Sequence, residues 1–194
     1  MTERRQAILD AASSLFAETG SRGTSIAAVA ARAGVTDAGV LYHFKTKKDL
    51  VLAAIEHFDS DVERQMQRSD LRGIDLLRAT REWGLGMEQV PEIQSMLVVM
   101  SAEYLHEPGP AREYLQGRYK RLLRRYVKAF RDAAKAGDLR PDLDAEHEAA
   151  ALIAHLDGIR LQWLLLDKSV SMADSVRTYV DSTLARLRPD SENR

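Results

Sequence analysis

Residues 25–44 have the sequence SIAAVAARAGVTDAGVLYHF, and this stretch decides the fold. Its first half places small and branched apolar side chains on one face of a short helix over residues 26–33. Gly34 follows, at a point where a left-handed residue can end that helix. Thr36 can then cap a second helix over residues 37–43. Two short helices joined by a tight glycine turn are typical of a helix-turn-helix, although a generic helical hairpin has the same spacing.

The apolar spacing stays helical on both sides of this stretch, and no segment alternates as a strand would. Gly20 and Gly23 end the first helix, and Thr46 can cap the helix that connects the two parts of the chain. The sequence predicts an all-α protein of about nine helices, with an N-terminal three-helix domain over residues 1–46 and a C-terminal helical bundle over 47–194. The predicted helices cover residues 2–19, 26–33, 37–43, 47–67, 71–89, 92–106, 110–136, 143–167 and 172–187.

The composition excludes several classes of protein. The chain has 194 residues, 45% of them apolar and 29% charged, with a net charge of −1 and no cysteine. Disulfides, thiolate catalysis and cysteine-ligated metals are therefore impossible. No apolar run reaches the roughly 18 to 20 residues of a membrane span, and the N-terminus lacks an apolar signal stretch. We expect a cytoplasmic protein without a membrane partner.

An enzyme is the competing hypothesis, and the sequence offers little for it. The ionisable candidates do not form a catalytic or phosphate-binding motif. We predict no enzymatic activity, no cofactor and no metal, although a cluster of histidines and carboxylates across helices stays open. A helical adaptor without a DNA role is a third hypothesis. The candidates for catalysis are His57, Glu103, His106, Glu107, His147 and His155.

Five segments carry a resemblance to a known family. They are AILDAA at 7–12, LFAETG at 15–20, TSIAAVA at 24–30, AGV at 33–35 and LYHFKTKKDL at 41–50. Together they resemble the TetR family of bacterial transcriptional regulators. The resemblance implies an all-α homodimer that binds double-stranded operator DNA, and a repressor released from a palindromic operator by a small-molecule effector. The alternative is a helical small-molecule-binding protein or enzyme without a DNA role.

The resemblance also implies which residues touch DNA. It places Ser25 and Lys47 at phosphates, and it places on the groove-facing helix Thr36, Asp37, Ala38, Gly39, Tyr42 and His43. Ser25 and Thr36 are N-cap residues in any case, and Tyr42 has an alternative role as a packing ring. Family members often carry a basic residue where this chain has Ala27 and Asp37, and a tyrosine where it has Leu41, so few phosphate contacts are expected.

The C-terminal part of the chain carries a weaker family resemblance, and it has more apolar residues than one core can bury. GDLRPDLD at 137–144, EAA at 148–150 and LDG at 156–158 resemble a TetR subset that includes the choline-responsive betaine-pathway repressors. The helix over 143–167 is apolar on more than one side, which predicts a four-helix dimer contact with the last helix. The alternative is a single large core within one chain. The predicted interface residues are Leu152, Leu156, Ile159, Trp163, Val176, Tyr179, Val180 and Thr183.

A ligand pocket is predicted on the helices over 71–89 and 92–106. Gly84 and Gly86 lack side-chain volume, which favours a cavity there, and methionines and aromatic rings adapt to apolar ligands. The alternative is that these side chains belong to the core. The predicted pocket residues are Trp83, Met87, Met96, Met100 and Tyr104.

The basic residues between 118 and 131 are predicted to form a solvated face, with an anion site or a second nucleic-acid surface as the alternative.

Overall fold

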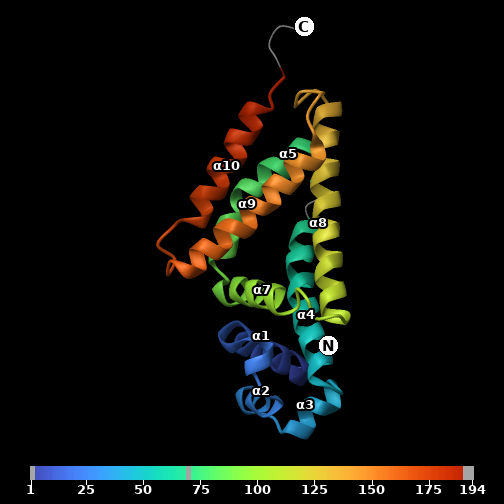
Figure 1. Ribbon diagram of the computed structural model, residues 1–194, viewed down its shortest axis with the longest axis vertical. Coiled ribbons are helices and arrows are strands. Elements are labelled where there is room, and N and C mark those ends of the chain that lie inside the picture. The colour runs from blue at the N-terminus through green and yellow to red at the C-terminus, as the bar shows by residue number, and fades with distance from the viewer. Residues whose placement is uncertain (1–2, 69–70, 190–194) are drawn as a thin grey trace. The chain divides into compact units, whose positions relative to one another are not determined.

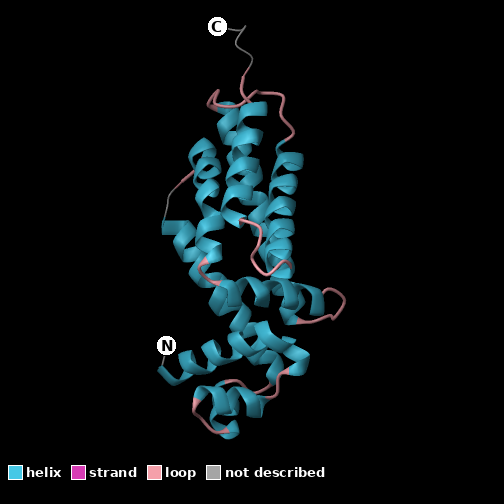
Figure 2. Cartoon of the chain, turned by 90° about the vertical axis from the view of Figure 1, so that its left-hand side faces the viewer, coloured by secondary structure: helices cyan, strands magenta, loops and turns pink. Residues whose placement is uncertain are grey.

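A computed structural model describes residues 3–68 and 71–189, and in this part of the chain helices and loops occur without any strand (Figure 2). The all-α prediction is therefore confirmed. The helices (Figure 1) are α1 (Glu3–Gly23), α2 (Ile26–Ala33), α3 (Asp37–His43), α4 (Lys47–Arg68), α5 (Gly73–Ala79), the 3₁₀ turn η1 (Thr80–Glu82), α6 (Trp83–Glu88), α7 (Pro91–Glu103), α8 (Pro110–Lys135), α9 (Ala145–Leu165) and α10 (Met172–Arg186).

One predicted helix is broken in the structure. The segment expected as a single helix over 71–89 consists of α5, the turn η1 and α6, which follow one another directly. Counted as one, this segment brings the described residues to nine helices, the predicted number. None of the described helices is long and apolar enough to cross a membrane.

Packing divides the chain into two compact units. The first consists of Met1–Ser69 and Pro91–Gly117, and the second of Asp70–Val90 and Arg118–Arg194. The boundary predicted after residue 46 falls inside the first unit, because α1 packs against α4 and α7 as well as α2.

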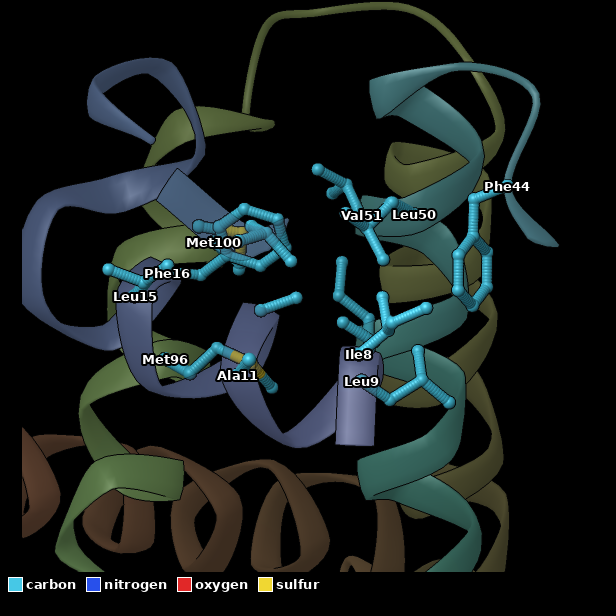
Figure 3. Packing of buried hydrophobic residues seen from close by; sticks show 14 of the residues in the cluster. Ile8, Leu9, Ala11, Leu15, Phe16, Phe44, Leu50, Val51, Met96 and Met100 are labelled. Atoms are coloured by element: carbon cyan, nitrogen blue, oxygen red, sulfur yellow. The ribbon is translucent and has the colours of Figure 1, made fainter. Parts of the chain in front are cut away.

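The first unit has α1 at the centre of its core (Figure 3). Phe16 and Ile8 of α1 are fully buried, and apolar side chains of α4 and α7 close around them. Removing this much apolar surface from water is the main force that holds the short helices α2 and α3 in place. The labelled side chains of this core are Ile8, Leu9, Ala11, Leu15, Phe16, Phe44, Leu50, Val51, Met96 and Met100.

The end of α1 is fixed to α7 by polar contacts. Gly20 has a φ of 71°, so the helix turns there, as the sequence predicts. The turn brings Ser21 to the Glu103 carboxylate, which accepts hydrogen bonds from the Ser21 N–H at 2.9 Å and from its hydroxyl at 2.6 Å. The Ser95 hydroxyl donates to the Ala17 carbonyl at 2.9 Å. These bonds fix the direction in which the chain enters the helix-turn-helix.

The second unit packs α5, α6, the rest of α8, α9 and α10 around a separate core. Gly84 lies where α6 meets the start of α10: a Cβ atom there would be 2.8 Å from the Met172 carbonyl oxygen. The prediction that Gly84 opens a cavity is therefore wrong, because the α10 backbone fills the space. Glu88 completes the contact by accepting from the N–H groups of Met172 at 2.7 Å and Ala173 at 3.0 Å.

Candidate DNA interface and effector region

The helix-turn-helix is built by local capping. The Ser25 hydroxyl oxygen accepts from the Ala28 N–H at 3.0 Å and begins α2. Gly34 ends it with a φ of 66°, and the Val35 N–H returns to the Ala30 carbonyl at 3.0 Å. This left-handed cap turns the chain sharply into the next helix, because glycine adopts a positive φ without steric cost.

Helix α3 is anchored on one side and exposed on the other. The Thr36 hydroxyl oxygen accepts from the Gly39 N–H at 3.1 Å and starts the helix. Val40 is fully buried beneath it, whereas Tyr42 is 85% exposed. The Tyr42 ring meets the neighbouring His43 ring edge-on, with centroids 5.2 Å apart. Such exposure does not fit the alternative of a packing ring and leaves the phenol open to a partner.

Most of the other residues predicted to contact DNA are also exposed to solvent at least in part. Asp37 and Ala38 are exposed in the first turn of α3, and Ser25 is exposed at the start of α2. Lys47 is half-buried at the first position of α4. The helix α4 begins with a reciprocal cap, in which the Asp49 N–H donates to the Thr46 hydroxyl at 3.2 Å and the Thr46 N–H donates to the Asp49 carboxylate at 3.0 Å.

Arg4 is a candidate that sequence reasoning missed. A surface hollow of about 1010 Å³ joins the first turn of α1 to α3, and Arg4 lines it together with predicted DNA residues. The adjacent pair Arg4-Arg5 was the available signal, but its position beside α3 depends on the tertiary packing. The hollow is lined by Glu3, Arg4, Ile8, Gly34, Val35, Thr36, Gly39, Tyr42 and His43.

The five predicted pocket residues belong to two different units. Met96 and Met100 are fully buried in the core of the first unit, and the Tyr104 hydroxyl shares a 2.9 Å hydrogen bond with Ser21. Burial raises the pKa of the Tyr104 phenol. Trp83 and Met87 lie in the second unit. A pocket formed by all five stays a prediction.

The predicted dimer residues lie mostly inside their own chain. All except Tyr179 are less than a tenth exposed, and the apolar ones among them belong to the core of the second unit. Tyr179 is half-buried and its ring stacks on His155, with centroids 4.1 Å apart. The alternative of a core within one chain accounts for the buried seven. The outward row of α9 holds instead Ala150, Ala154, Leu161 and Leu165.

A polar cluster in the second unit was not predicted. Arg160 of α9 is only 4% exposed and donates to the Asp157 carboxylate at 2.8 Å, and the Tyr119 hydroxyl of α8 donates to the same carboxylate at 2.9 Å. The Arg160 guanidinium lies over the Trp83 ring, 5.4 Å from its centroid. Arg118 is also buried, which departs from the solvated face expected for the basic residues of this region.

Burial shapes the ionisation of this cluster. It lowers the pKa of the Arg160 guanidinium, with the neighbouring Asp157 charge acting in the opposite direction. Burial likewise raises the pKa of the Tyr119 phenol, and the Asp157 charge adds to that rise. In the described residues, no three His, Asp or Glu side chains gather closely enough to hold a metal ion.

Two family models together cover most of the chain. The model of the bacterial regulatory proteins of the tetR family matches residues 8–54. The model of the C-terminal domain of BetI-type transcriptional repressors matches residues 88–189, more than half of the chain. The chain belongs to the TetR family. It is therefore a helix-turn-helix transcriptional regulator and not an enzyme, and like other TetR regulators it binds operator DNA and small-molecule ligands.

Individual TetR regulators are similar along nearly the whole chain. The regulator TtgR of Pseudomonas putida is 28% identical over 193 residues, which cover 96% of this chain and 92% of TtgR. The repressor BepR of Brucella suis is 24% identical over 193 residues, which cover 96% of this chain and 92% of BepR.

Solved structures of bacterial transcriptional regulators have the same fold. SmeT, the repressor of a multidrug efflux pump of Stenotrophomonas maltophilia, superposes with a TM-score of 0.78 at 23% identity, covering 98% of this chain and 93% of SmeT. A regulator of Saccharomonospora viridis in complex with choline has a TM-score of 0.77 at 25% identity, covering 95% and 97% of the two chains.

Proposed function

We propose that this TetR regulator is a homodimeric repressor that reads a palindromic operator with α3 and leaves it when a small effector binds. The observation that carries the proposal is the division of α3 into a buried side, held by Val40, and an open side that presents Tyr42. A short helix anchored in this way can enter the major groove without disturbing the core beneath it.

The open side of α3 offers mixed chemistry for base contacts. Asp37 can accept from a cytosine amino group, and Tyr42 and His43 can each donate or accept a hydrogen bond. Ser25, Lys47 and Arg4 supply the phosphate contacts that set the register without reading sequence. Two such surfaces related by a two-fold axis fit half-sites about 34 to 36 Å apart, or a multiple of one helical turn.

The dimer is proposed to form through the outward faces of α9 and α10. Leu161 and Leu165 of α9 are 43% and 71% exposed, which is unusual for leucines on a helix whose other side is packed. Ala150 and Ala154 continue the same row with small side chains that let a second helix approach closely. The contact therefore keeps the predicted pair of helices but uses different residues.

Effector release is proposed as a shift between two conformations of the dimer. A ligand lowers operator affinity only if it binds the DNA-incompetent conformation more tightly than the competent one. A difference of about 1 to 3 kcal/mol is usual for such coupling, and operator DNA must then weaken effector binding by the same factor. BepR and SmeT are both named as repressors, which supports repression rather than activation by this chain.

The test is fluorescence anisotropy with an operator selected from genomic fragments. We expect Lys47→Ala to weaken binding to every sequence alike and to reduce the slope of affinity against salt by about 1 per subunit, because one phosphate contact is lost. Tyr42→Phe should change the preference among half-site variants if the hydroxyl reads bases.

The matched control for this test is Lys120→Ala. It removes the same charge from an exposed position on α8 and should leave binding unchanged. Equal binding by wild type, Lys47→Ala and Tyr42→Phe would show that the DNA surface lies elsewhere.

A further inference from the structure

The cluster of Trp83, Tyr119, Asp157 and Arg160 has no part in the proposed DNA or dimer surfaces. Arg160 is buried, and the other three side chains are half-buried. It joins three helices, α6, α8 and α9, inside the second unit. Burying the Arg160 guanidinium removes its charge from water, which costs free energy even though the half-buried Asp157 carboxylate pairs with it. A buried cation in this core therefore needs a reason beyond stability.

Trp83 supplies that reason, because its indole N–H has no hydrogen-bond partner among the described residues although the nitrogen is buried. A buried indole N–H ordinarily finds an acceptor, since leaving it unpaired costs free energy. Indole is a donor only, and so is the Arg160 guanidinium above it. The missing group at this position is therefore an acceptor.

The charges around the indole indicate the kind of acceptor. The Arg160 guanidinium lies over one face of the Trp83 ring at 5.4 Å and brings a positive charge close to the unpaired N–H. Lys168 lies over the ring of Trp163, also at 5.4 Å. A quaternary ammonium needs open aromatic faces, and here a protein cation already covers a face of each tryptophan. An anionic acceptor is attracted at the same position.

We propose that the effector is an organic anion with an apolar body, whose carboxylate accepts from the Trp83 Nε1–H in the field of Arg160. This proposal rests on the effector-responsive function proposed above and narrows its ligand class. Asp157 and Tyr119 act as positioning residues, because their hydrogen bonds hold Arg160 over the indole. A choline-like cation is excluded from this position.

The experiment is calorimetric titration of the full-length protein with three carboxylates: 4-butylbenzoate, 1-naphthoate and octanoate. The neutral analogue 4-butylbenzamide and choline are titrated alongside. We expect at least one carboxylate to bind, 4-butylbenzamide to bind about tenfold more weakly than 4-butylbenzoate, and choline to give no binding heat. Trp83→Phe keeps an aromatic ring but removes the indole N–H together with the five-membered ring that carries it, and it should weaken carboxylate binding about tenfold.

Trp163→Phe is the matched control, since it removes the other indole N–H from the same core and should leave carboxylate binding unchanged. The inference is overturned if choline binds, if none of the carboxylates binds, or if Trp83→Phe binds them as wild type does. Operator binding, measured in parallel, separates the two proposals. A wild type that binds its operator but no carboxylate refutes only the ligand class, whereas a wild type that binds no selected operator refutes the proposed function.

Discussion

At the scale of a single residue, Gly84 lets α6 and α10 pack closely together because it has no side chain. The α6 backbone approaches the first turn of α10 so closely that a Cβ atom would lie 2.8 Å from one backbone atom and 2.9 Å from another. Both neighbours are backbone atoms, which cannot move aside as the end of a flexible side chain can. The Glu88 contacts to Met172 and Ala173 depend on the same approach.

Gly84→Ala is therefore expected to destabilise the protein by about 1 to 3 kcal/mol, the usual cost of overpacking. The measurement is the free energy of unfolding in urea. Gly86→Ala is the control, because Gly86 lies in the same helix with open space around it, and alanine there should be neutral or stabilising by up to about 1 kcal/mol. Equal effects of the two substitutions would contradict the close contact.

At the scale of the element, α7 holds the end of α1 through one carboxylate. Ser21 is almost fully buried, and the Glu103 carboxylate is the acceptor for both its N–H and its hydroxyl hydrogen. The contact fixes the last turn of α1 just before the chain enters α2. The orientation of the helix-turn-helix within the first unit therefore depends on a residue far away in the sequence.

Glu103→Gln should lower the free energy of unfolding by about 1 kcal/mol, because charge-assisted hydrogen bonds become neutral ones. Amide hydrogen exchange at Ser21 should quicken at the same time. Glu92→Gln makes the same change at an exposed position of α7 and serves as the comparison. Unchanged exchange at Ser21 in the Glu103 variant is the result that argues against this role.

His155 of α9, which contacts α10, is expected to make the stability of the folded protein depend on pH. Burial lowers the pKa of His155, whose ring stacks on Tyr179 and whose Nε2 lies 3.2 Å from the Ser175 hydroxyl. The unfolded chain therefore binds more protons than the folded one just below the ordinary histidine pKa of about 6.5. The stability contributed by neutral His155 is complete above that pH and is lost as the pH falls toward the lower, folded-state pKa.

We expect His155→Gln to lose part of the decline in unfolding free energy that wild type shows between about pH 6.5 and pH 5.5. Urea unfolding at several pH values measures the difference between the two proteins. A variant whose curve runs parallel to that of wild type over this range would mean that His155 does not titrate differently in the folded state.

At the scale of the whole molecule, the outward row of α9 is expected to make the dimer. Light scattering at micromolar concentration should give about twice the chain mass of 21.7 kDa, since exposed leucines on two copies bury each other. Leu161→Glu combined with Leu165→Glu should give a folded monomer. Leu156→Glu should instead unfold the chain, because Leu156 is buried in the core. A monomeric wild type rules out the proposed contact.

Local sequence was sufficient for the position of most helices, although the segment predicted as one helix over 71–89 is divided into α5, η1 and α6. Gly20, Gly34 and Thr36 act through their own backbone or through atoms three or four residues away, so their roles do not depend on the rest of the chain. The function was inferred from the resemblance to the TetR family, and the family models confirm that resemblance. The resemblance also placed Tyr42 on the groove-facing helix, and the structure shows Tyr42 exposed and Val40 buried on that helix.

The inner and outer faces of α9 could not be predicted in the same way. Its apolar residues occur all around the helix, so periodicity does not say which row meets α10 of the same chain and which meets solvent or a second copy. The same reason applies to Trp83 and Arg160, which lie far apart in the sequence and meet only when α6 packs beside α9.

Sequence by itself determined the helices, their caps and the family, because those depend on neighbours along the chain. Only the tertiary structure decided which apolar row is core and which donors share a buried site, because burial and charge pairing depend on neighbours in space.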